Sequence, residues 1–124
     1  MVYFRSKFPV KSNNKYHAQK TTIGNTTYDS KKEAKRGEYL DWLQKIGQIS
    51  DLQKQVPFIL QESYTNNKGE KIRAIIYVAD FVYTQDGQKI VEDVKGGTAT
   101  QTDVFKIKKK LFERKYPEFD FRVF

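Results

Sequence analysis

An Asp-Gly dipeptide at residues 86–87 separates two strand-like runs, Lys71–Thr84 and Lys89–Lys95. An Asp-Gly pair between such runs is typical of a two-residue β-hairpin turn, whose positions favour residues that tolerate positive φ angles. If these two residues form the whole turn, Gln85 faces Gln88, and every other pair in the hairpin follows from that one. The turn therefore predicts an antiparallel pair of strands together with its register.

The predicted register places two carboxylates, Asp80 and Asp93, directly opposite each other. Facing Cβ atoms in an antiparallel pair lie about 4.5–5.5 Å apart, and like charges at that distance repel. A divalent cation between the two carboxylates would neutralise them, and such hard oxygen ligands suit Mg²⁺ or Mn²⁺. Lys95 shares the face of Asp93 and would orient or activate a water and stabilise charge that develops on a phosphate. The same face also carries Val78, Val82 and Val91.

Two alternatives stay open for this hairpin. Asp80, Asp93 and Lys95 could form a salt-bridged group on a solvated sheet face, with no metal ion. A bulged three-residue turn would shift the register by one residue and place Glu92, rather than Asp93, opposite Asp80.

The rest of the chain indicates a single domain over residues 21–124, preceded by a basic N-terminal arm over residues 1–20. Ser30, with Glu33 three residues later, matches a capping box and predicts the start of a helix that stops at Gly47. The expected fold is α/β, with a central mixed β-sheet (an antiparallel meander plus a last strand) flanked by two helices. The expected elements are a short hairpin at 21–28, a helix at 30–46, strands at 56–64, 71–84 and 89–95, a helix at 102–115 and a strand at 119–124. The apolar positions of the second helix are Val104, Phe105, Ile107, Leu111 and Phe112.

The net charge of +8 is unevenly distributed along the chain. Residues 1–28 carry five basic residues and no acidic one, residues 101–116 carry six basic and two acidic residues, and residues 29–100 carry eleven of each. Basic residues gathered in this way are typical of a surface that binds a polyanion, so we expect nucleic acid as a partner. Solubility alone, or a solvated helix face, would also account for them. The residues expected to contact a DNA backbone are Arg5, Lys7, Lys11 and Lys15 in the arm and Lys106, Lys108, Lys109 and Lys110 in the second helix.

The composition excludes several kinds of chemistry. The chain has no cysteine, which excludes disulfides, thiolate zinc sites and cysteine nucleophiles, and its single histidine, His17, argues against a histidine triad. No apolar run approaches the roughly 20 residues of a membrane span, and no signal-like segment follows Met1. We therefore expect a cytosolic protein without a membrane partner or a small-molecule cofactor, whose polar chemistry comes from Asp, Glu, Lys, Ser or Thr.

The residues of the predicted cluster also carry a resemblance. Asp80 followed by Asp93-Val94-Lys95 is similar to the PD-(D/E)XK signature of the restriction-endonuclease-like nucleases, except that Ala79 stands before Asp80 in place of proline. Nearly the whole chain resembles a small family of phage and prophage proteins catalogued as a domain of unknown function, usually placed in the same nuclease superfamily. The segments that carry this second resemblance are Asn14-Lys15-Tyr16, Tyr28-Asp29-Ser30-Lys31-Lys32-Glu33-Ala34, Tyr77-Val78-Ala79-Asp80-Phe81, Val91-Glu92-Asp93-Val94-Lys95-Gly96 and Asp103-Val104-Phe105-Lys106-Ile107-Lys108.

The resemblance implies a role for each residue of the signature. Asp80 and Asp93 would ligate the metal ion, and the backbone carbonyl of Val94 would complete the protein ligands. Lys95 would serve the attacking water. The resemblance also implies an acidic residue from the first helix, for which Glu33 is the first candidate and Glu38 the alternate. Glu92 is an alternate metal ligand in the shifted register of the hairpin. Glu33 is equally explained by the capping box that begins at Ser30.

These expectations describe a restriction-endonuclease-like fold and a Mg²⁺- or Mn²⁺-dependent endodeoxyribonuclease of phage or prophage origin, acting in the cytoplasm of a bacterial host. One domain leaves no room for a separate sequence-reading module, so branched or junction DNA, as cut by Holliday junction resolvases, is the expected substrate. A homodimer is implied by the resemblance alone. Two alternatives stay open: a non-catalytic nucleic-acid-binding or interaction protein that keeps the nuclease fold, and a ribonuclease.

Overall fold

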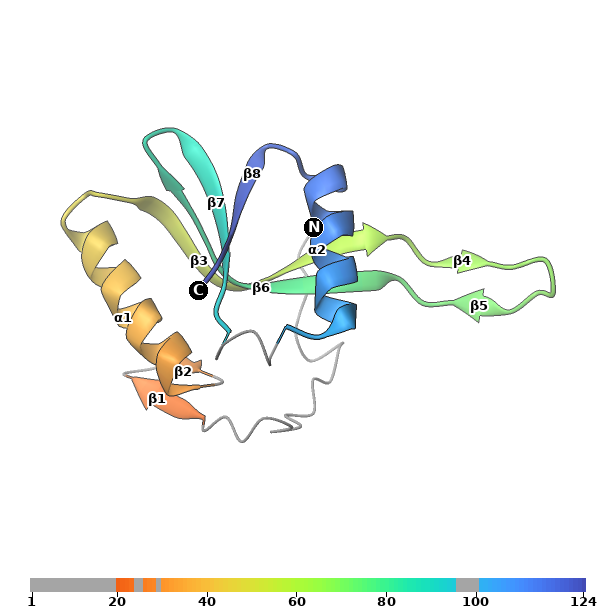
Figure 1. Cartoon of the computed structure of the whole chain (residues 1–124), viewed down its shortest axis with the longest axis horizontal. Helices are drawn as coiled ribbons and strands as arrows, with labels where there is room; N and C mark the ends of the chain where they lie inside the picture. The colour runs from red at the N-terminus through yellow and green to blue at the C-terminus, as the bar shows by residue number, and fades with distance from the viewer. Residues whose placement is uncertain (1–19, 24–25, 29, 96–100) are drawn as a thin grey trace.

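The centre of the fold is a four-stranded mixed sheet with the strand order β3-β6-β7-β8 (Figure 1). The computed structural model describes residues 20–23, 26–28, 30–95 and 101–124. β3 (Ser50–Gln61) and β7 (Gln88–Asp93) both run antiparallel to β6 (Ile75–Gln85), which lies between them. β8 (Phe119–Val123) lies parallel to β7 at the other edge. The predicted meander with a last strand is confirmed, and so is the α/β class.

The turn between β6 and β7 is the one that the Asp-Gly dipeptide predicts. Asp86 and Gly87 have φ angles of 51° and 78°. Gln85 pairs with Gln88, and the same register continues to the pair of Phe81 and Glu92. The alternative register, which would place Glu92 opposite Asp80, is therefore wrong.

Both helices begin at a capping side chain: Ser30, which the capping box predicts, and Thr102, the first residue of the second predicted helix. The Ser30 hydroxyl accepts the Glu33 backbone N–H at 3.1 Å and begins α1 (Lys31–Lys45). The Thr102 hydroxyl accepts the Phe105 backbone N–H at 3.1 Å and begins α2 (Asp103–Lys115). These bonds satisfy N–H groups that the first helical turn would otherwise leave unpaired.

The two helices cover opposite faces of the sheet, α1 on one and α2 on the other (Figure 1). α1 packs through Leu40 on a core cluster that includes Ile90 of β7. α2 packs through Phe105 and Phe112 on a second cluster that includes Val91. Ile90 and Val91 are consecutive residues of one strand and so point to opposite faces, which lets β7 contribute to both clusters.

The apolar positions of α2 divide into two groups. Phe105 and Phe112 are buried, whereas Val104, Ile107 and Leu111 expose 61%, 57% and 38% of their surfaces. Two aromatic side chains, two turns apart, therefore supply the contact of α2 with the sheet. The other three residues form an apolar row at the edge of that contact.

The first strand of the meander, β3, begins earlier than predicted. β3 begins at Ser50 rather than Val56, and it contains two residues with positive φ, Asp51 and Gln55, together with a register shift between Ser50 and Gln53. Such irregularities interrupt the alternation of apolar and polar residues that identifies a strand. The sequence before Val56 therefore does not show the pattern from which a strand is predicted.

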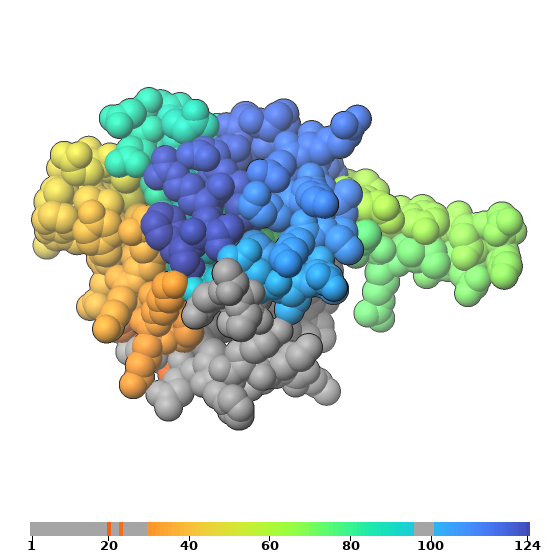
Figure 2. All heavy atoms as spheres, viewed as in Figure 1, coloured from red at the N-terminus to blue at the C-terminus, as the bar shows by residue number. Residues whose placement is uncertain are grey.

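Two small hairpins complete the described structure. β1 (Thr21–Ile23) pairs with β2 (Thr26–Tyr28), as predicted. β4 (Tyr64–Thr65) pairs with β5 (Lys71–Ile72), and this hairpin projects from the body of the molecule (Figure 2). No helix in the described part of the chain is long and apolar enough to cross a membrane.

Candidate active site

Three neighbouring strands bring polar side chains into one row across the sheet. Gln55 lies between the β3 residues that pair with Phe81 and Ala79, so it is level with Asp80 of β6. Continuing the β6–β7 register by one pair from Phe81 places Asp93 level with Asp80 on its other side. The turn chemistry thus brings the two aspartates together as predicted. Gln55 is a third member of the row, which the sequence analysis missed.

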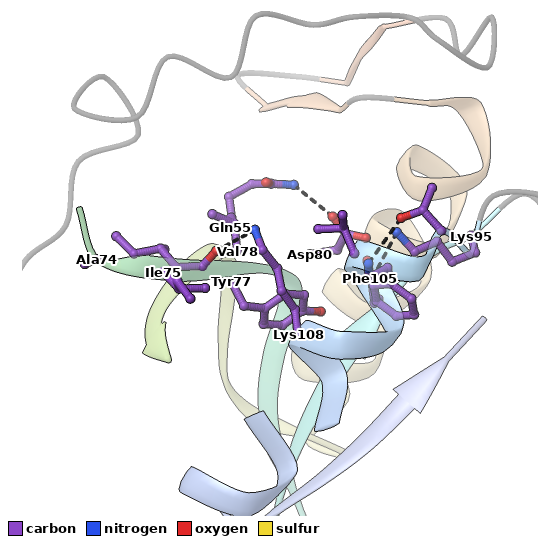
Figure 3. Close-up of a pocket in the computed structure, with 13 residues that line it drawn as sticks. Gln55, Ala74, Ile75, Tyr77, Val78, Asp80, Lys95, Phe105 and Lys108 are labelled. Carbon is purple, nitrogen blue, oxygen red and sulfur yellow. Dashed lines mark hydrogen bonds and ion pairs between the residues drawn. The ribbon is translucent and has the colours of Figure 1, made fainter. Parts of the chain in front are cut away.

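Both aspartates line a pocket of about 690 Å³ between β6 and α2 (Figure 3). The pocket also receives the predicted lysine of the signature, Lys95. Its other lining residues include Gln55, Tyr77, Val78, Val104, Phe105 and Lys108. The pocket is therefore partly charged, at the carboxylate end, and partly apolar.

Asp80 has a hydrogen-bond donor at each carboxylate oxygen. Oδ2 accepts the Val94 backbone N–H at 2.7 Å. Oδ1 accepts an N–H of the Gln55 amide at 3.4 Å, as Figure 3 shows. Burial raises the pKa of Asp80 well above its ordinary value, and the neighbouring carboxylates of Glu33 and Asp93 raise it further. Negative charge on Asp80 is thus poorly compensated by the residues around it.

Asp93, the last residue of β7, is 5% exposed. Lys95 Nζ lies 3.3 Å from Asp93 Oδ2, but this oxygen has no hydrogen-bond partner among the described residues. The Tyr77 hydroxyl is also buried without a hydrogen-bond partner in that part of the chain, and its pKa is raised by burial and then by the charges of Asp93 and Asp80. Because buried polar atoms are nearly always hydrogen-bonded, two such atoms at one place favour a functional interpretation of the cluster.

Glu33 reaches the cluster from the first turn of α1 and is 3% exposed. The Gln55 amide nitrogen donates to Glu33 Oε1 at 2.9 Å, so one amide links Glu33 with Asp80. Gln55 has a φ angle of 56°, a left-handed conformation that costs a residue with a side chain about 1–2 kcal/mol. Backbone strain of this kind concentrates at functional sites, which is consistent with a role for Gln55 in the site.

The two alternate carboxylates lie outside the cluster. Glu38 is exposed on α1. Glu92 is fully buried in the α1 face of the sheet, where the Arg36 guanidinium donates two hydrogen bonds of 2.7 and 2.6 Å to it and the Tyr83 hydroxyl donates a third. Glu92 is therefore fully engaged in a buried ion pair on the side of β7 away from Asp93.

A family model described as "Protein of unknown function (DUF1064)" matches residues 13–123. The chain belongs to this family. No curated protein and no solved structure matches it. The family description carries no activity, so the chemistry of the site in this DUF1064 protein must be argued from its own residues.

The donor set of this DUF1064 protein suits a hard divalent cation. Asp80 and Asp93 present adjacent carboxylate oxygens, one of them buried and without a hydrogen-bond partner among the described residues, and such ligands bind Mg²⁺ or Mn²⁺. Within the described ranges, however, no three His, Cys, Asp or Glu side chains are already grouped so that they could hold a metal ion. The Gln55 amide lies between Glu33 and Asp80, so a cation held by all three acidic residues would require that amide to move. The residues fit a cation held by the two aspartates.

Of the residues expected to contact DNA, the four lysines of α2 are the described ones, and they differ in their surroundings. Arg5, Lys7, Lys11 and Lys15 lie outside the described residues. Lys106 and Lys110 are exposed on α2, as a backbone-binding role requires. Lys109 is paired with Glu113 at 3.0 Å, and Lys108 turns into the pocket, where its Nζ donates to the Ile76 carbonyl at 2.8 Å.

Proposed function

We propose that this DUF1064 protein is a metal-dependent endonuclease of the PD-(D/E)XK type that hydrolyses DNA phosphodiesters, with Mg²⁺ or Mn²⁺ as its cofactor. The observation that carries the proposal is the pairing of Asp80 and Asp93 beside the Lys95 ammonium, in a pocket where burial leaves the carboxylates poorly compensated. Carboxylates that hold a cation, next to a positively charged side chain, suit phosphodiester hydrolysis because negative charge grows on the phosphate during the reaction.

Each residue of the cluster has a distinct role in this proposal. Asp80 and Asp93 would hold the cation, with the Val94 carbonyl as a further donor. Glu33 would join them once the Gln55 amide that lies between Glu33 and Asp80 moves aside. A bound cation supplies Lewis acidity and a water of lowered pKa. Lys95 Nζ, which lies between Asp93 and the Phe105 ring (4.1 Å to the ring centroid), would orient the attacking water and hold a non-bridging phosphate oxygen.

The proposal extends to the fold family, the partners and the biological setting. We assign the mixed sheet with its two helices to the restriction-endonuclease-like core. The net charge of +8 and the exposed Lys106 and Lys110 support DNA as the partner. Branched or junction DNA as substrate, a homodimer, phage or prophage origin and the cytoplasm of a bacterial host complete the proposal, on the strength of the resemblance.

A cleavage panel with the full chain tests the proposal. Linear, nicked, flapped and four-way DNA, together with RNA of the same sequences, would be incubated with EDTA, Mg²⁺ or Mn²⁺. We expect cleavage of DNA only with a divalent cation, and a loss of about 100-fold or more in Asp80→Asn and in Lys95→Ala. Cleavage of RNA alone would make the protein a ribonuclease. Full activity in both variants would overturn the assignment of the site.

Two matched controls separate chemistry from general damage. Asp41→Asn removes an exposed carboxylate of α1 that is paired with Lys54, and it should leave cleavage unchanged. Glu33→Gln and Glu38→Gln make the same change on one helix, but only Glu33 is buried at the cluster. Glu33→Gln should therefore reduce cleavage and Glu38→Gln should not.

The non-catalytic alternative is favoured by one observation, the Gln55 amide between two of the acidic side chains. If that amide permanently takes the place of a cation, the protein would bind nucleic acid without cutting it. Calorimetric titration with Mn²⁺, combined with DNA binding in EDTA, distinguishes the two functions. DNA binding without metal binding and without cleavage would support the alternative.

A further inference from the structure

The pocket beside the carboxylates extends beyond what a metal site requires. β7 pairs with β6 only from Phe81 to Gln85, whereas β6 continues to Ile75, where it pairs with β3. The pocket follows this part of β6 over residues 74–78 and faces the first turns of α2 (Figure 3). Its volume, about 690 Å³, lies within the roughly 300–1,000 Å³ of pockets that enclose small organic ligands.

Two positively charged side chains, Lys95 and Lys108, line the pocket together with apolar side chains (Figure 3). Lys95 lies at the carboxylate end, against the Phe105 ring. Lys108 follows Phe105 by three residues, so it projects into the pocket one helical turn further along α2. The apolar lining of the pocket includes Val78 and Val104.

Lys108 has no ion pair among the described residues, unlike Lys109, the next residue of the helix. Lys108 is half-buried, and its ammonium donates to the Ile76 backbone carbonyl, while no acidic side chain in the described ranges forms an ion pair with it. Its charge is therefore available to an anion that enters the pocket. Lys109, the next residue, is already paired with Glu113.

We propose that this pocket binds one unpaired nucleotide next to the scissile phosphate, with Lys108 holding the adjoining phosphate. The inference rests on the proposed nuclease function and defines its substrate class. In this proposal Lys95 holds the scissile phosphate, Lys108 holds the next phosphate of the same strand, and the sugar and base contact Val78 and Val104 in the same pocket. A base that is paired and stacked in a duplex cannot enter such a pocket, so the substrate is DNA with an unpaired nucleotide at the cut.

The test measures binding, so it does not depend on cleavage. Fluorescence anisotropy in EDTA compares single-stranded, flapped and fully duplex oligonucleotides of one sequence. Val104→Trp places a bulky side chain in the pocket wall. Ile107→Trp is the matched control: it introduces the same side chain one turn later, outside the pocket, and Ile107 is 57% exposed where Val104 is 61% exposed. We expect Val104→Trp to weaken binding of single-stranded and flapped DNA about tenfold and of duplex DNA less than about twofold. Ile107→Trp should leave all three within about twofold of the parent.

A second pair of variants tests the phosphate contact itself. Lys108→Met keeps the aliphatic stem and removes the charge, and Lys110→Met makes the same change on an exposed part of the helix. In Lys108→Met the salt dependence of single-stranded binding should fall by about 0.7 in the log–log slope, as one phosphate contact predicts, with the duplex slope unchanged. Lys110→Met should affect single-stranded and duplex DNA alike.

The outcomes separate this inference from the proposed function. If the parent protein binds DNA but Val104→Trp behaves like Ile107→Trp and Lys108→Met behaves like Lys110→Met, the pocket does not hold a nucleotide and only this inference fails. If the parent binds no DNA of any form, the proposed function fails with it. Should Val104→Trp not fold, the lysine pair decides the question alone.

Discussion

Glu92 and Asp93 are consecutive carboxylates of β7, and removal of their charges should have opposite effects on stability. Glu92 is fully buried and accepts two hydrogen bonds from Arg36 and one from Tyr83. Glu92→Gln keeps the shape of the side chain but removes the charge. It also replaces one acceptor oxygen with an amide NH₂ group, which cannot accept a hydrogen bond from the donor that faces it. Breaking a buried ion pair costs about 3–5 kcal/mol. Because the Arg36 side chain is 22% exposed and can gain water, we expect a loss of about 3 kcal/mol in the free energy of unfolding.

Asp93→Asn should be neutral or stabilising in the metal-free protein. The carboxylate it replaces has an oxygen without a hydrogen-bond partner among the described residues, and it repels Asp80. The substitution also removes the ion pair with Lys95, whose ammonium lies 3.3 Å from an Asp93 oxygen that has no hydrogen-bond partner among the described residues. Unlike the pair of Glu92 with Arg36, this pair is not hydrogen-bonded, so we expect it to contribute no more than about 1 kcal/mol. We therefore expect the free energy of unfolding to change by between zero and about +1 kcal/mol.

Urea unfolding in EDTA at neutral pH measures both changes, followed by circular dichroism and by the fluorescence of the single tryptophan, Trp42. In a chain of this length the loss in Glu92→Gln corresponds to a fall of roughly 10–15 °C in Tm. Arg36→Met should show a loss similar to that of Glu92→Gln, since it breaks the same pair. If Asp93→Asn lost as much stability as Glu92→Gln, Asp93 would be a structural residue and the reasoning about the cluster would be refuted.

Three more changes have expected outcomes by the same urea assay. The raised pKa of Asp80 lets the folded chain keep a proton that the unfolded chain has already released. The free energy of unfolding in EDTA should therefore fall as the pH rises from the ordinary carboxylate range through the folded pKa of Asp80. Asp80→Asn should flatten this slope, and an unchanged slope would contradict the assignment. Phe112→Ala should cost about 3–5 kcal/mol because Phe112 is fully buried, whereas Leu111→Ala, at 38% exposure, should cost about 1 kcal/mol or less. Gly87→Ala should cost about 1–2 kcal/mol from its φ of 78° alone, since nothing lies within 4 Å of an added Cβ, and a neutral result would argue against this turn.

The pairing of the two aspartates is predictable from the sequence because it depends on local turn chemistry. Asp86 and Gly87 favour one turn type, and that turn has one register. The register continues over five pairs without a shift, to Phe81 and Glu92, and its next position is that of Asp80 and Asp93. The capping residues are predictable for the same reason, since each bond spans three residues of the chain. Local rules of this kind also place Glu33 in the first turn of α1.

Gln55 is not predictable by the same reasoning. Its position depends on two irregularities of β3, the positive φ angles at Asp51 and Gln55 and the register shift after Ser50, and none of these has a marker in the sequence. Neither residue with positive φ in β3 is a glycine. Gln55 is held in place by tertiary contacts, because its amide donates hydrogen bonds to side chains of α1 and β6.

The lysine run of α2 shows a second limit of sequence reasoning. Four lysines within five residues predict a basic surface, but a helix turns consecutive residues to different sides. Lys106 and Lys110 therefore stay exposed, Lys109 is paired with Glu113, and Lys108 points into the pocket. Which lysine enters depends on how Phe105 and Phe112 seat the helix on the sheet, and the charge pattern alone does not contain that information.

The early end of β7 explains why the carboxylates and the pocket lie side by side. After Asp93 the chain leaves the β6 ladder, and the next backbone N–H, that of Val94, donates to the Asp80 side chain. The end of β7 is tied to β8 as well, because Phe124 N–H donates to the Asp93 carbonyl at 2.9 Å. The Asp80 side chain thus accepts the first backbone N–H that follows β7. The part of β6 that precedes Asp80 in the chain faces α2 and forms one wall of the pocket. Asp80→Ala would leave that Val94 N–H without its acceptor and would perturb the fold as well as the chemistry, whereas Asp80→Asn keeps an acceptor oxygen. The asparagine variant is therefore the one that separates a catalytic role of Asp80 from its structural role at the end of β7.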